Sequence, residues 1–157
     1  MCHPWSDLAL TCVIAFSSMY GHTEQMADTI GRFLAEQGVK KIRIHDTSKT
    51  HPSYIINDIF RYKGVILGSC AYNGGIFPTM ETLLCELENM GIKNHLLAYF
   101  GNKTWGGGAI PRLKAFAEKM KWEVVAEPNE ALGAMKSSDI EQCKAIAQAM
   151  AEKIKKS

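Results

Sequence analysis

The chain has 157 residues, of which 46% are hydrophobic and 22% charged, and its formal net charge at pH 7 is +2. This length is typical of one domain that buries about 70% of its unfolded surface, and the composition is ordinary for a soluble globular protein. The small net charge, without a lysine–arginine cluster interleaved with aromatic residues, disfavours a nucleic-acid-binding protein.

The cysteines and the hydropathy pattern favour a cytoplasmic protein. Five cysteines stand at positions 2, 12, 70, 85 and 143 without a Cys-x-x-Cys pair, which disfavours a disulfide scaffold or a zinc site. Residues 1–5 lack the basic and apolar regions of a signal peptide, and no apolar run approaches the length of a membrane span. We predict one cytoplasmic domain over residues 1–157, with residues 1–11 as an N-terminal extension, no metal site and no membrane contact.

Five short apolar segments have the length and composition of β-strands, and a segment with helical periodicity follows each of them. The predicted strands are Cys12–Phe16, Lys41–His45, Gly64–Ser69, His95–Gly101 and Trp122–Ala126. This alternation predicts an α/β fold in which helices cover both faces of a doubly wound, five-stranded parallel sheet. The strand order 2-1-3-4-5 is expected.

Apolar residues at three- and four-residue spacing mark the predicted buried faces of four helices. In chain order they are Met26, Ile30, Phe33 and Leu34; Ile55, Ile56, Ile59 and Phe60; Met80, Leu83, Leu84, Leu87 and Met90; and Ile140, Cys143, Ile146, Ala147, Met150 and Ile154. A fifth helix is predicted from about Ala109 to Met120, and Ser138-Asp139 are predicted to cap the last helix.

Several residues of chemically interesting types are assigned structural roles. Cys12, Cys85 and Cys143 are predicted to lie in the core, and Cys70 to pack at the base of a loop. Trp5 and Trp122 are predicted packing residues, and solvated or capping roles are predicted for His45, His51 and His95.

The loop after the first predicted strand, Ser17–Glu24, has the composition of a phosphate-binding turn. The hydroxyls of Ser18 and Thr23 can donate hydrogen bonds, and the first amides of the following helix point to the same place. No lysine follows Gly21, unlike the loop that binds nucleoside triphosphates, and the second glycine of the dinucleotide fingerprint is absent. A monophosphate ester bound without a metal is the predicted ligand.

Two further loops rich in glycine and polar residues follow the third and fourth predicted strands, over Cys70–Pro78 and Asn102–Gly108. In the order 2-1-3-4-5 the carboxyl ends of strands one, three and four are neighbours. We therefore expect the three loops to converge at the ligand-binding edge of the sheet.

In these loops the chain resembles the flavodoxin family, and most of all the flavodoxin-like domain of A-type flavoproteins (flavodiiron proteins). The resemblance rests on residues 18–24, on residues 72–78, and on Phe100-Gly101 with Trp105 and the glycines after it. It implies FMN, with the phosphate in the first loop and the isoalloxazine ring between the second and third. Tyr72 and Trp105 are the aromatic residues available to line the ring.

The residues that the resemblance implies as FMN contacts come from all three loops. They are Ser18, Met19, Tyr20, Gly21, His22 and Thr23; Ser69, Cys70, Ala71, Tyr72, Asn73 and Gly74; and Gly101, Asn102, Lys103, Thr104, Trp105, Gly106 and Gly107.

The chain also departs from the family pattern. Ser69-Cys70-Ala71 stands where flavodiiron domains usually have Ser-Pro-Thr, Asn102-Lys103 where they have serine and tyrosine, and His22 where they have asparagine. A protonated His22 is predicted to favour the phosphate dianion, and Lys103 to make the reduction potential of the flavin less negative. The His-x-Glu-x-Asp-His signature of a di-iron domain is absent from the sequence, so chemistry at a metal centre is not assigned to this chain alone.

The predicted function is electron transfer by bound FMN, rather than catalysis by a stand-alone enzyme. A rubredoxin-like donor and a di-iron oxygen or nitric oxide reductase module are the implied redox partners. Two alternatives remain open: an FMN-dependent NAD(P)H:quinone-type oxidoreductase, and a flavin-free signalling domain of the same architecture.

Overall fold

A computed structural model describes residues 10–19, 21–72, 75–92, 95–103 and 108–156. In chain order the elements are β1 (Thr11–Ser17), α2 (His22–Glu36), β2 (Lys41–Asp46), α3 (Pro52–Arg61), β3 (Gly64–Tyr72), β4 (Gly75–Ile76), α4 (Pro78–Met90), β5 (Leu96–Lys103), α5 (Ile110–Met120), β6 (Glu123–Val124), β7 (Asn129–Leu132) and α6 (Ser137–Lys156).

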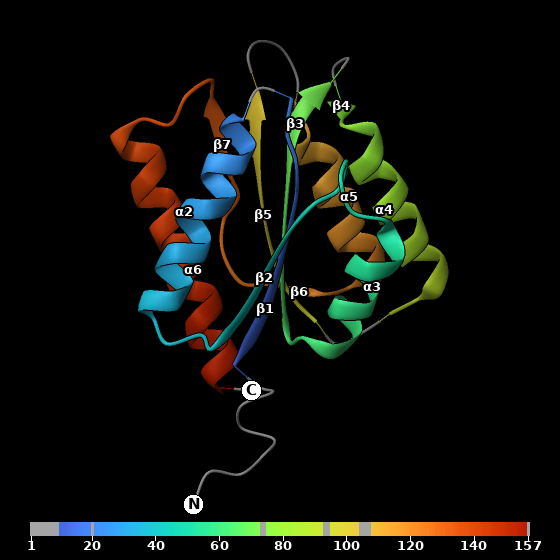
Figure 1. Cartoon of the computed structure of the whole chain (residues 1–157), viewed down its shortest axis with the longest axis horizontal. Helices are drawn as coiled ribbons and strands as arrows, with labels where there is room; N and C mark the ends of the chain where they lie inside the picture. Colours follow the sequence, from blue (N-terminus) through green and yellow to red (C-terminus); the bar gives the residue numbers. More distant parts are fainter. Residues whose placement is uncertain (1–9, 20, 73–74, 93–94, 104–107, 157) are drawn as a thin grey trace, which may run out of the picture.

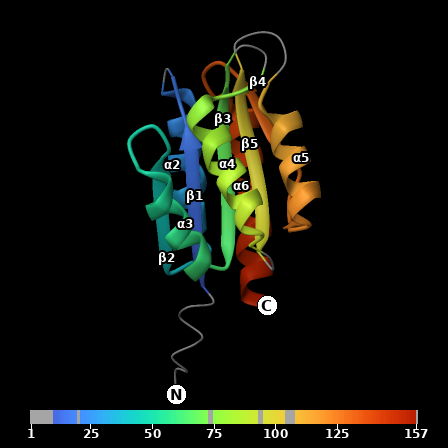
Figure 2. The same ribbon diagram turned by 90° about the vertical axis from the view of Figure 1, so that its right-hand side faces the viewer.

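The sheet has the order β2-β1-β3-β5-β6, and all of these neighbours are parallel. Strand β7 also pairs with β5, and the two-residue strand β4 forms an antiparallel hairpin with β3. Helices α2 and α6 cover one face of the sheet and α3, α4 and α5 the other (Figures 1 and 2). The predicted doubly wound α/β fold and its order 2-1-3-4-5 are confirmed.

Along the central strands β1, β3 and β5, successive side chains belong alternately to two apolar cores. Their even-numbered residues, such as Ile14, Ile66 and Ala98, belong to the cluster under α2 and α6. Their odd-numbered residues, such as Val65 and Leu97, belong to the cluster under α3, α4 and α5. Burial on both faces is the reason that these strands appear in the sequence as nearly continuous apolar runs.

The predicted fifth strand, Trp122–Ala126, is wrong in its extent. Only Glu123–Val124 pair with the start of β5, and the chain then pairs with the end of β5 as β7. Pro128, which lacks a backbone N–H, lies between the two strands. Trp122 confirms its predicted packing role, because its ring is buried and its indole N–H donates to the Ile92 carbonyl oxygen at 2.8 Å.

Four residues assigned to buried helix faces are exposed. Phe60, Met90 and Ile140 are 58%, 56% and 40% exposed, and Cys85 is also exposed. Phe60 and Cys85 each follow a buried residue directly, so each lies about 100° further round its helix. Met90 is the last residue of α4, and Ile140 lies in the first turn of α6.

The predicted capping role of His51 is confirmed, because its Nδ1 accepts a hydrogen bond from the Ser53 amide at the start of α3. A solvated or capping role is wrong for His45. His45 Nε2 lies 2.7 Å from an Asp58 carboxylate oxygen, with both side chains about five-sixths buried. His95 has a capping role as predicted, because its Nε2 donates at 2.6 Å to the carbonyl oxygen of Ile59, one of the last four carbonyls of α3.

The last helix begins at Ser137. The predicted cap Ser138-Asp139 lies within its first turn, where the Asp139 carboxylate accepts a hydrogen bond from the Lys136 amide at 3.0 Å. Among the described helices, none is long and apolar enough to cross a membrane.

Candidate functional site

The carboxyl ends of β1, β3 and β5, from which the three predicted loops begin, lie side by side. Ser17, Ser69 and Gly101 are neighbours in the ladder, and each stands at or close to the start of one of the loops. Figure 1 shows this end of the sheet at the top, between the two layers of helices. The strand ends from which the three loops begin are neighbours, as predicted, whereas residues 20, 73–74 and 104–107 of the loops lie outside the described residues.

The first loop turns tightly into α2. The Ser18 hydroxyl accepts a hydrogen bond from the Gly21 amide at 2.9 Å, and Gly21 has φ 87°, a left-handed conformation that glycine adopts without strain. Gly21 is the N-cap residue of α2 and carries no side chain to cap the helix. The amides of the first turn therefore lack an intrahelical acceptor and carry the positive end of the helix dipole.

Two polar atoms in that turn are buried without a partner. Thr23 is 1% exposed, and neither its Oγ1 nor Nδ1 of His22 has a hydrogen-bond partner in the part of the chain that the structure describes. Burying an unsatisfied hydroxyl costs about 1–3 kcal/mol, so such atoms are uncommon without a ligand. Together with the free amides, they form a set of donors that fits a phosphate group.

The second loop is closed by Ser69. Its hydroxyl donates to the Cys70 carbonyl oxygen at 2.9 Å and accepts from the Phe77 amide at 3.1 Å, which joins the two ends of the β3–β4 hairpin. Tyr72, which is 39% exposed, packs edge-to-face against Phe77 with ring centroids 5.5 Å apart. This contact supports an aromatic side chain that faces solvent at the ligand edge of the sheet.

Cys70 lies where the first and second loops meet, which agrees with its predicted packing role. Burial raises the pKa of its thiol, and this effect is partly offset by hydrogen bonding to the backbone of Met19 and of Cys70 itself. A thiol with a raised pKa is a poor nucleophile at neutral pH, so Cys70 acts by packing rather than by thiolate chemistry.

Three hydroxyls form a cluster at the start of α4, the helix that follows the second loop. The sequence alone does not indicate this cluster. Thr79 in the first turn of α4 lies 2.8 Å from the Thr47 hydroxyl and 3.4 Å from the Ser17 hydroxyl, and Ser17 and Thr47 are also in hydrogen-bond contact. The cluster joins the end of β1 to the helix that follows the second loop.

The third loop is supported by β7, a strand that is not among those predicted. The Asn102 side-chain amide donates to the Gly133 carbonyl oxygen at 2.6 Å. The Glu130 carboxylate lies so close to Gly108 that a Cβ atom built there would overlap it. A carboxylate thus borders the third loop although the second and third loops contain none in their own sequence.

Some predicted contacts lie outside the described residues. These are Tyr20, Asn73, Gly74, Thr104, Trp105, Gly106 and Gly107, together with the side chain of Lys103. Within the described ranges, no group of three or more His, Cys, Asp or Glu side chains is placed to hold a metal ion.

Comparison with known proteins supports the architecture. A family profile described as flavodoxin matches residues 14–146. An anaerobic nitric oxide reductase flavorubredoxin of Escherichia coli K12 is 28% identical over 112 residues, which cover 71% of this chain and 23% of that protein. The chain therefore spans less than a quarter of this curated relative.

Solved structures show the same fold. Rubredoxin oxygen:oxidoreductase from Desulfovibrio gigas superposes with a TM-score of 0.90 at 26% identity, over 94% of this chain and 36% of that chain. Flavodoxin 1 from Bacillus cereus, at 21% identity and a TM-score of 0.78, covers 90% of this chain and 97% of its own. The fold matches both a complete flavodoxin and one part of a larger oxidoreductase.

Proposed function

The chain belongs to the flavodoxin family, whose cofactor is FMN, and on that premise we propose that it is an electron-transfer domain. The observation that carries the proposal is the first turn of α2, where amides without an intrahelical acceptor lie beside the Thr23 hydroxyl, which has no partner among the described residues. When bound, FMN supplies one- and two-electron chemistry, and the residues of the chain bind and orient it.

In this proposal the first loop binds the phosphate of FMN, and the second and third loops contact its ring. Ser18 holds the turn through its bond to Gly21, and the first-turn amides with Thr23 hold the phosphate. Tyr72 in the second loop and Trp105 in the third are proposed to line the isoalloxazine ring. The remaining contacts implied by the resemblance, Lys103 included, stay predictions.

The proposed redox partners follow from the relatives. One is named a nitric oxide reductase flavorubredoxin and another a rubredoxin oxygen:oxidoreductase, and this chain corresponds to only a part of each. We therefore propose a rubredoxin-like electron donor and a di-iron oxygen or nitric oxide reductase module as acceptor. The cytoplasm is the proposed compartment, in agreement with four described cysteines that are all free thiols.

The purified apoprotein is expected to bind FMN and to remain yellow after the unbound flavin is removed, with an absorbance band at about 450 nm. Bound FMN is expected to be reduced through a protein donor and not to turn over NAD(P)H with a quinone in the absence of a partner. Steady NAD(P)H:quinone turnover by the isolated chain would favour the reductase alternative. A protein that is colourless after incubation with excess FMN and removal of the unbound flavin would favour the flavin-free alternative.

His22 is expected to make FMN binding depend on protonation. A protonated imidazole beside the phosphate favours binding of the anion, so we expect the FMN affinity of the wild type to fall relative to that of His22→Asn as the pH rises. We expect the ratio of the wild-type dissociation constant to that of His22→Asn to rise about threefold between about pH 5.5 and about pH 8. The free phosphate also titrates, at about pH 6, but this contribution is common to both proteins and cancels in the ratio. Parallel pH profiles would remove His22 from the phosphate site.

A further inference from the structure

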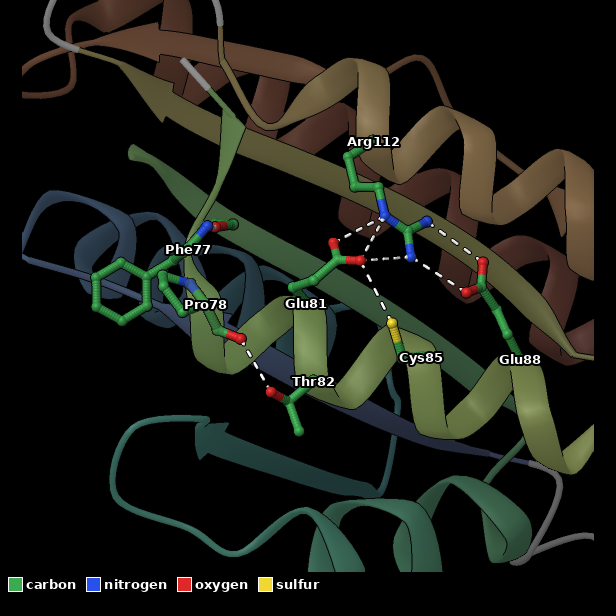
Figure 3. Close-up of polar contacts among 8 residues, drawn as sticks. Phe77, Pro78, Glu81, Thr82, Cys85, Glu88 and Arg112 are labelled. Atoms are coloured by element: carbon green, nitrogen blue, oxygen red, sulfur yellow. Dashed lines mark hydrogen bonds and ion pairs between the residues drawn. The ribbon is translucent and has the colours of Figure 1, made fainter. Parts of the chain in front are cut away.

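An arginine of α5 is bound by two glutamates of α4 (Figure 3). Arg112 Nε lies 2.8 Å and 3.1 Å from the two carboxylate oxygens of Glu81, and Nη2 lies 3.0 Å from one of them. The same guanidinium reaches Glu88 at 3.1 Å and 3.3 Å. All of these bonds link two helices that are adjacent on the same face of the sheet.

The geometry distinguishes this cluster from an ordinary surface ion pair. Arg112 contacts each carboxylate through two of its nitrogens and both carboxylate oxygens, which gives directional bonds as well as charge attraction. The exposed fraction of the side chain is 25% for Arg112, 39% for Glu81 and 9% for Glu88, so the cluster is partly buried and Glu81 is its most exposed member. Hydrogen bonding from Arg112 holds the pKa of the Glu81 carboxyl below its ordinary value, so the carboxylate is ionised at neutral pH.

The position of the pair in the chain relates it to the candidate site. Glu81 is the fourth residue of α4, the helix that follows the second loop. Arg112 is the third residue of α5, the helix that follows the third loop. A proline at the start of each helix restricts how the loop leads into it. The bond between Glu81 and Arg112 thus ties together the helix starts that adjoin the two loops.

We propose that Arg112 is a positioning residue that holds the second and third loops at the separation required by the flavin ring. This inference rests on the proposed FMN-binding function. Without the guanidinium, α4 and α5 are free to shift, and a smaller fraction of the apoprotein has the binding-competent separation. The apparent dissociation constant rises as the inverse of that fraction.

The test compares Arg112→Met, which keeps most of the aliphatic stem, with Glu81→Gln and Glu88→Gln. Dissociation constants of apoprotein for FMN and for riboflavin are measured by fluorescence titration, and stability by urea unfolding. Both Arg112→Met and Glu81→Gln are expected to weaken FMN and riboflavin by the same factor, about five- to tenfold. The equal factor is expected because the bond between Glu81 and Arg112 adjoins the two loops assigned to the ring and not the phosphate loop.

Glu88→Gln is the matched control. It also removes a charged partner of Arg112, but Glu88 lies about two turns further along α4 from the loop. We expect less than about a twofold change in flavin affinity, with a lower urea midpoint. The Glu81→Gln/Arg112→Met double variant is expected to bind no more weakly than the weaker single variant, because both substitutions remove the same link.

The outcomes separate this inference from the proposed function. If the wild type binds FMN and Arg112→Met lowers only the urea midpoint, Arg112 is a structural residue and the inference is overturned. If Arg112→Met does not fold, Arg112→Lys keeps the charge and loses the fork, and unchanged FMN affinity in that variant overturns it equally. A wild type that binds no FMN refutes the proposed function itself.

Discussion

Replacing Thr23 with valine is expected to weaken FMN binding about 10- to 100-fold while leaving the apoprotein at least as stable as the wild type. A hydrogen bond to a charged phosphate contributes about 1.5–3 kcal/mol, which corresponds to that range. In the apoprotein the Thr23 hydroxyl is buried and has no partner among the described residues, so its removal takes away an unsatisfied polar atom. Flavin titration and urea unfolding measure the two effects separately.

Thr29 provides the matched control on the same helix. Its hydroxyl is also buried, but it donates to the Gln25 carbonyl oxygen at 2.8 Å. Thr29→Val is therefore expected to leave FMN affinity unchanged and to destabilise the protein by about 0.5–1.5 kcal/mol. Riboflavin, which lacks the phosphate, is expected to bind wild type and Thr23→Val equally. Equal losses of FMN and riboflavin affinity would contradict a phosphate contact.

The first loop shows how far the sequence predicts the site. Its place between a buried strand and a helix predicts an anion-binding turn, and the sequence treats Ser18 and Thr23 as equivalent donors. In the structure the two differ, because the Ser18 hydroxyl accepts a bond from Gly21 whereas that of Thr23 has no partner among the described residues. That difference depends on the three-dimensional path of the turn, which residue types alone do not specify.

The edge of the sheet was less predictable. Strand β7 contains Asn129 and Glu130 after Pro128, so neither its composition nor its periodicity indicates a strand. It is a strand because β5 offers a free edge for pairing, as the partners of Phe100 to Lys103 show. The contact of Glu130 with the third loop follows from this pairing. It could not be predicted from the sequence, because β7 itself could not.

The spacing of apolar residues does not predict contacts between helices either. The spacing of apolar residues predicts which side of α4 packs on the sheet, and Leu83 and Leu87 are indeed buried there. It does not predict which polar residue of another helix lies beside Glu81. Arg112 is 31 residues away in the chain, and only the packing of α4 beside α5 brings the two together.

Replacing Gly68 with alanine is expected to destabilise the protein by about 3 kcal/mol, a large part of the stability of a typical domain. Gly68 is paired in register with Phe16 on β1 and Phe100 on β5, so the glycine lies between two aromatic residues on one face of the sheet. A Cβ atom at this position would overlap the Phe100 ring, which is fully buried and has no space to withdraw. The urea midpoint measures the loss.

Gly31→Ala is the control for a glycine that also has close neighbours. A Cβ atom there would lie 2.9 Å from Cδ1 of Ile44, the end of a side chain that is 40% exposed and free to rotate away. Alanine also favours the helix by about 0.5–1 kcal/mol, so this variant is expected to be as stable as wild type or slightly more stable. Adding Phe100→Leu to Gly68→Ala is expected to recover part of the loss, because the smaller side chain makes room for the methyl group. A Gly68→Ala protein with the wild-type midpoint would mean that the Phe100 ring moves freely at this position, in conflict with its close packing against β3.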